Sequence, residues 1–151
     1  MKIEEIHIYT YQLPILIPLQ IGNTTITSRT GAIINIKTSA SIYGFGEASP
    51  LPGLHQESLN DIKSELMEIK SLLIGTHLEE VFTAIDNMQK NKKLSSCAQF
   101  AVESAILGII EQVNLNGEKK IMPDPQNRTI FINGLITGNN STILKESEKC
   151  L

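Results

Sequence analysis

The stretch GAIINIKTSASIYGFGEASPLPG, residues 31–53, decides the expected fold. Over residues 31–38 an apolar series at even positions alternates with a mixed series at odd positions, which is the period of a half-buried β-strand. A short polar link leads into a second such run over residues 42–48, so the two runs predict an antiparallel hairpin. Two prolines and a glycine in residues 49–55 then exclude regular structure and indicate a stiff loop.

Upstream of this stretch, apolar and polar residues interleave from Ile3 to Leu13 and predict a further strand. Pro14 and Pro18 are expected to end its pairing. The run from Leu19 to Thr30 is rich in Thr, Asn, Ser and Gly without an apolar period, so it is predicted to be a mobile loop. Three consecutive strands suggest a meander.

Downstream, apolar residues recur at spacings of three and four from Leu59 to Leu73, and Gly75 follows as a plausible stop, so a helix is predicted. Thr76 is expected to cap a shorter helix whose apolar face runs from Val81 to Met88. A third helix is predicted at residues 97–113, capped by Ser95 or Ser96. Its small residues form a stripe that would let another backbone approach closely: Ala98, Ala101, Ala105 and Gly108.

The last part of the chain has a different pattern. Residues 117–128 have linker composition, and residues 129–136 form a nearly continuous apolar run typical of a strand buried on both faces. A predicted helix then begins at Thr142. We therefore expect an α+β domain at residues 1–116, a linker at 117–128, and the truncated first βα unit of a TIM-type barrel at 129–151.

Composition excludes several classes of partner. Net charge is −3, from 13 basic and 16 acidic residues that are mixed along the chain, so neither nucleic acid nor membrane is expected to bind. The first residues lack the positive flank and apolar run of a secretion signal, which predicts a cytoplasmic protein. Cys97 and Cys150 lie far apart outside any metal-ligand spacing, and Cys97 is predicted to be a small buried residue.

Three segments resemble the muconate-lactonising branch of the enolase superfamily. Residues 44–53, GFGEASPLPG, resemble the strand end and loop of its amino-terminal capping domains, and residues 96–105, SCAQFAVESA, resemble a helix of the same domain. Residues 132–138, INGLITG, are similar to the first barrel strand of o-succinylbenzoate synthases. The o-succinylbenzoate synthase family is therefore the one that the chain resembles most.

This resemblance implies the capping α+β fold, with two loops that close over a (β/α) barrel of the same parent chain. It also implies a lyase of menaquinone biosynthesis, which dehydrates a small-molecule carboxylate substrate by abstracting a proton next to the carboxylate, with magnesium stabilising the enediolate. In such families the catalytic lysines and metal-binding carboxylates lie on later barrel strands. We therefore predict no catalytic residue and no metal ligand in this chain, which would be inactive alone.

The predicted substrate contacts come from the two loops and from the first barrel strand. Apolar residues of the loops would exclude water from the site, and His55 would contact the substrate at its rim. The alternative is that the loop residues only pack together, and that Asn133 makes a structural hydrogen bond. Glu47 is expected to cap backbone N–H groups. The predicted substrate-binding residues are Leu19, Ile21, Leu51, Leu54, His55 and Asn133.

Two other functions remain open from the sequence. A related epimerase or cycloisomerase would share the same cap and differ in its loops and barrel. Alternatively, the chain could stand alone as an α+β binding module that dimerises through its last strand.

Overall fold

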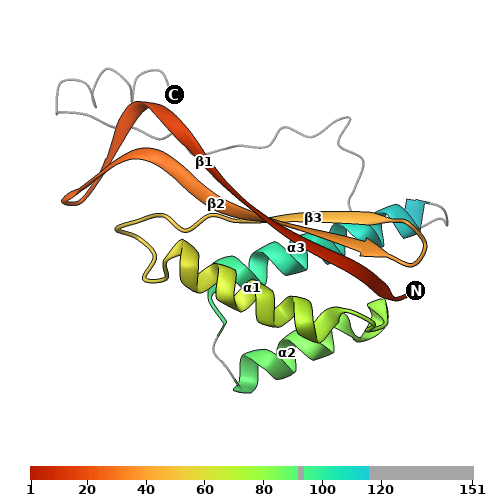
Figure 1. Cartoon of the computed structure of the whole chain (residues 1–151). Helices are drawn as coiled ribbons and strands as arrows, with labels where there is room; N and C mark the ends of the chain where they lie inside the picture. Colours follow the sequence, from red (N-terminus) through yellow and green to blue (C-terminus); the bar gives the residue numbers. More distant parts are fainter. Residues whose placement is uncertain (92–93, 116–151) are drawn as a thin grey trace, which may run out of the picture.

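The computed structural model describes residues 1–91 and 94–115, and within them a three-stranded antiparallel sheet is followed by helices (Figure 1). The strands are β1 (Ile3–Ile21), β2 (Thr24–Thr38) and β3 (Tyr43–Ala48), in the order β1-β2-β3. The predicted meander is confirmed. The predicted linker at 117–128 and barrel unit at 129–151 lie outside the described residues.

The predicted loop from Leu19 to Thr30 is wrong, because β1 and β2 continue to pair as far as Ile21 opposite Thr24. Gly22 closes this hairpin with a φ of 54°, in the region that favours glycine. Pro14 stays in register opposite Ser28, and the register shift before Leu19 accommodates the second proline. β1 is an edge strand, which tolerates proline.

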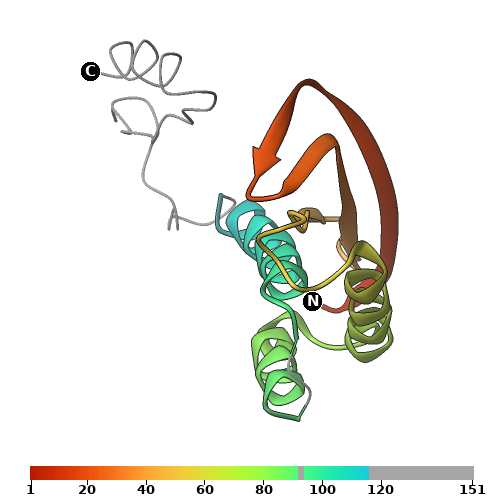
Figure 2. The same ribbon diagram turned by 90° about the vertical axis from the view of Figure 1, so that its left-hand side faces the viewer.

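The outer part of this hairpin, residues 12–30, projects beyond the helices and curves over at its end (Figure 2). We call it the arm. Most of its side chains are at least partly exposed, with Ile26 as the buried exception. A strand that is solvated on both faces carries no alternating apolar pattern, which is why periodicity did not reveal it.

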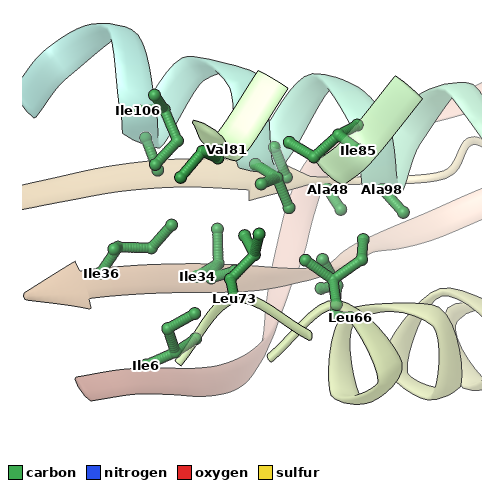
Figure 3. Packing of buried hydrophobic residues seen from close by; sticks show 14 of the residues in the cluster. Ile6, Ile34, Ile36, Ala48, Leu66, Leu73, Val81, Ile85, Ala98 and Ile106 are labelled. Carbon is green, nitrogen blue, oxygen red and sulfur yellow. The ribbon is translucent and has the colours of Figure 1, made fainter. Parts of the chain in front are cut away.

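The helices are α1 (Leu59–Leu73), the short 3-10 helix η1 (Leu78–Glu80), α2 (Val81–Asn91) and α3 (Ser96–Leu115). They gather on one side of the sheet, where α3 lies along β3 and α1 packs against β1 and β2. Figure 3 shows the resulting core between the layers. Its fully buried larger side chains include Ile6, Ile34, Ile36, Leu66, Leu73, Val81, Ile85 and Ile106. Among the helices in the described part of the chain, none is long and apolar enough to cross a membrane.

The small-residue stripe of α3 does permit a close backbone approach, by β3. A Cβ on Gly46 would overlap the carbonyl oxygen of Ala101, and one on Gly44 would overlap that of Ala105. At Gly108 the expected close approach is absent, because no atom lies within 4 Å of its Cβ position. Two glycines on the strand therefore match two alanines on the helix.

A reciprocal cap fixes the start of α1. Ser58 Oγ accepts from Asp61 N at 3.3 Å, and Asp61 Oδ2 accepts from Ser58 N at 2.8 Å. We expect Ser58→Ala to lower the free energy of unfolding by about 1 kcal/mol in urea denaturation at pH 7. Ser64→Ala is the control: its hydroxyl bonds Asn60 O inside the helix, and its loss should have little effect. Equal effects of both changes would contradict the capping role.

The cap also predicts a pH dependence. Hydrogen bonds from Ser58, first from its side chain and then from its backbone, hold the pKa of Asp61 below its usual 3.8. A lowered pKa means that Asp61 contributes its stabilisation fully above 3.8, and that this is lost as the pH falls through the folded-state value.

Candidate functional site

The loop at residues 49–55, here loop 49–55, connects β3 to the approach of α1 and is ordered by internal hydrogen bonds. Leu51 O accepts from the backbone N–H groups of Leu54 and His55, both at 3.0 Å. Leu51 N donates to His55 Nδ1 at 3.0 Å. A neutral His55 that accepts at Nδ1 carries its proton on Nε2, so Nε2–H is the ring's donor.

His55 lines a pocket of about 370 Å³ at the end of β3 and the start of α3. The pocket brings together residues from three separate segments of the chain. Its other lining residues are Glu47, Ser49, Ser96, Cys97 and Phe100. The structure therefore places His55 on a concave surface with both polar and apolar lining residues, and its contact with a substrate stays a prediction.

The other predicted substrate-binding residues differ in how exposed their side chains are. Ile21, at the tip of the arm, reaches loop 49–55: its Cγ2 would lie 3.4 Å from a Cβ placed on Gly53. Leu19 and Leu51 are half-buried, whereas Leu54 is 69% exposed. Asn133 lies outside the described residues. The arm and the loop thus pack together at Ile21, and Leu54 remains available to a further surface.

The prediction that Glu47 caps backbone N–H groups is wrong. Glu47 accepts a hydrogen bond from the Tyr11 hydroxyl, which also lies 3.1 Å from Ser49 Oγ. Gly31 stands opposite Tyr11 in the sheet, and a Cβ there would overlap the Tyr11 ring, so the glycine leaves room for the ring to cross β2 towards β3. Burial, followed by the bond to Glu47, raises the pKa of Tyr11 above its usual 10.0.

Arg29 is a further residue that sequence reasoning missed. Its Nη2 donates to Ser49 Oγ at 2.6 Å and to Ser49 O at 3.0 Å, and its Nη1 donates to Pro50 O at 3.3 Å. Ser49 Oγ in turn donates to Thr30 O at 3.2 Å. The start of loop 49–55 is therefore bonded to both β1 and β2.

Cys97 is half-buried in the pocket wall, less buried than predicted. Burial, and then the nearby Glu57 carboxylate, raise the pKa of its thiol above the usual 9.0. We expect Cys97 to alkylate with iodoacetamide more slowly at pH 8 than an unhindered thiol, because less thiolate is present. Glu57→Gln should speed the reaction, whereas the surface control Glu79→Gln should not. Peptide mass spectrometry follows Cys97 separately from Cys150, and equal rates in both variants would contradict this electrostatic explanation.

Magnesium has no candidate ligands among the residues that the structure describes. Within residues 1–91 and 94–115 there is no group of three or more His, Cys, Asp or Glu side chains that could hold a metal ion. The described residues therefore do not fit a magnesium site, and no chemical step is assigned to them through a metal.

Comparison with known proteins identifies the domain. A family model described as MenC, N-terminal domain, matches residues 3–101. No curated protein matches the chain. Among solved structures, a dipeptide epimerase from Enterococcus faecalis V583, complexed with Mg and the dipeptide L-Leu-L-Tyr, superposes with a TM-score of 0.69 at 23% identity, over 75% of this chain and 32% of that one.

Two further solved structures match the fold of this chain over a similar share of its length. An N-succinyl Arg/Lys racemase from Bacillus cereus ATCC 14579 is 24% identical, with a TM-score of 0.68 over 75% of this chain and 31% of its own. A muconate lactonizing enzyme from Pseudomonas fluorescens, complexed with muconolactone, is 25% identical, with a TM-score of 0.68 over 74% and 31%. The chain thus spans about a third of the length of the structures it matches.

Proposed function

Because the chain belongs to the family of MenC N-terminal domains, we propose that it is the capping portion of a magnesium-dependent o-succinylbenzoate synthase. The family match over residues 3–101 carries this proposal, since it covers the sheet, the arm, loop 49–55 and the beginning of α3. The capping fold is shared with enolase-superfamily enzymes of other activities, so the fold alone does not select the reaction.

In this proposal the cap and a barrel domain of the same protein have separate tasks. The barrel would hold the magnesium, whose chemistry as a Lewis acid the reaction would use, together with the group that abstracts the proton. The cap binds over the small carboxylate substrate and excludes water. Leu54 suits the apolar part of this cover because its side chain is largely exposed while its backbone is hydrogen-bonded.

We assign His55 the polar contact. His55 Nδ1 accepts a hydrogen bond from the backbone N–H of Leu51. The Nε2–H on the other side of the ring can therefore donate to a substrate carboxylate at the pocket. Leu19, Ile21 and Leu51 would shape the apolar surface around it. Asn133, on the proposed first barrel strand, would approach the substrate from the barrel.

The experiment that tests the reaction class uses the protein extended through the barrel, with magnesium. We expect dehydration of the succinyl-hydroxycyclohexadiene carboxylate and no racemisation of dipeptides or N-succinyl amino acids. The second candidate is an epimerase or racemase, which is favoured by the matched structures of those activities. Racemisation without dehydration would establish that second candidate and contradict the first.

A further inference from the structure

Arg29 joins the two segments that cover the proposed ligand site. We propose that Arg29 is a positioning residue that couples the arm to loop 49–55, so that the two move as one lid and hold His55 in place. This inference rests on the proposed function for its consequence in catalysis. Its structural content depends only on the described residues.

Every side-chain hydrogen bond that the structure gives Arg29 ends on loop 49–55, at Ser49 or Pro50. Among the described residues, Arg29 forms no ion pair with a carboxylate. Its planar guanidinium instead holds three neutral oxygen atoms at the point where the loop leaves β3, a geometry that a single ammonium group does not reproduce. The Arg29 guanidinium therefore uses its hydrogen bonds to hold the start of loop 49–55.

Ser49 is the shared partner that makes this a junction between strands. Its hydroxyl accepts from Arg29 and donates to Thr30 O, so it is bonded twice to β2. Tyr11 of β1 reaches the same hydroxyl and Glu47 of β3. All three strands therefore meet at the root of loop 49–55.

The other end of the loop also lies beside the tip of the arm. Gly53 has a φ of 85°, and its Cβ position lies 3.4 Å from Ile21 Cγ2 and 3.6 Å from Thr24 Oγ1. The arm and the loop are thus hydrogen-bonded at the root and lie close together at the tip. A displacement of the arm must therefore carry the loop with it, unless the hydrogen bonds of Arg29 break.

Amide hydrogen exchange in the 151-residue chain tests the coupling without any substrate. In Arg29→Met we expect the amides of Leu54 and His55 and those of the arm to exchange at least about tenfold faster, because charge-assisted hydrogen bonds are lost. The α1 amides should keep their rates. Arg29→Lys should give an intermediate result, and so should Ser49→Ala, because it leaves the Arg29 bonds to the main-chain oxygens of Ser49 and Pro50 in place.

The matched control is Gln12→Ala, which removes a different side-chain bond of the arm, to Ser28 Oγ at 3.2 Å, and leaves loop 49–55 untouched. Loop exchange should be unchanged in this variant. Faster exchange of the loop without the arm, or of neither segment, would overturn the coupling. A uniform increase that includes α1 would also overturn it, since it would show global destabilisation. A failed synthase assay would leave this result intact, so the two proposals fail separately.

Discussion

Gly46→Ala is expected to lower the free energy of unfolding by about 3 kcal/mol, as measured by chemical denaturation. The added Cβ would overlap the carbonyl oxygen of Ala101, which belongs to the backbone of α3 and has no flexible end that could move aside. Relief requires β3 and α3 to separate, which would loosen the core between them.

Gly108→Ala is the matched control, because it introduces the same methyl group on α3, the helix against which Gly46 of β3 packs. The space around Gly108 is open, so this change should raise the free energy of unfolding by about 0.5–1 kcal/mol through helix propensity. The two glycine variants should therefore shift stability in opposite directions. If Gly46→Ala were as stable as Gly108→Ala, the close packing of β3 on α3 would be refuted.

Leu66→Ala should have the second large effect, a loss of about 2–5 kcal/mol. Leu66 is fully buried in the cluster with Ile34, and shortening it would leave a cavity between α1 and the sheet (Figure 3). Leu72 on the same helix is 44% exposed, so Leu72→Ala should cost much less. Urea denaturation of both variants measures the difference, and similar losses would contradict the placement of the apolar face of α1.

The elements with one buried face were predictable from the sequence, because burial produces the period that reveals them. α1 and α3 begin and end within about two residues of their predicted limits, and the inner half of the meander was found. The arm was not found, because a strand solvated on both faces has no apolar period, and its prolines argued against pairing. Its hairpin register depends on Gly22, which the sequence alone did not identify as the turn.

The candidate site was predictable only where it depends on local sequence. His55 follows from the composition of loop 49–55 and from the family resemblance, and the structure places it in a pocket wall. Arg29 and Tyr11 are separated from their partners by 20 and 36 residues or more, so their roles depend on strand pairing. Gly31 is the signal that could have indicated Tyr11, because a glycine opposite an aromatic residue leaves room for its ring.

The most direct test of the proposed cap assignment compares turnover of the succinyl-hydroxycyclohexadiene carboxylate, with magnesium present, by this 151-residue chain and by a protein extended through the proposed barrel. We predict magnesium-dependent product from the extended protein and none above background from the 151-residue chain. Product formed by the 151-residue chain alone would show that the reacting groups lie within it, and would contradict the assignment of this domain as a cover for chemistry performed elsewhere.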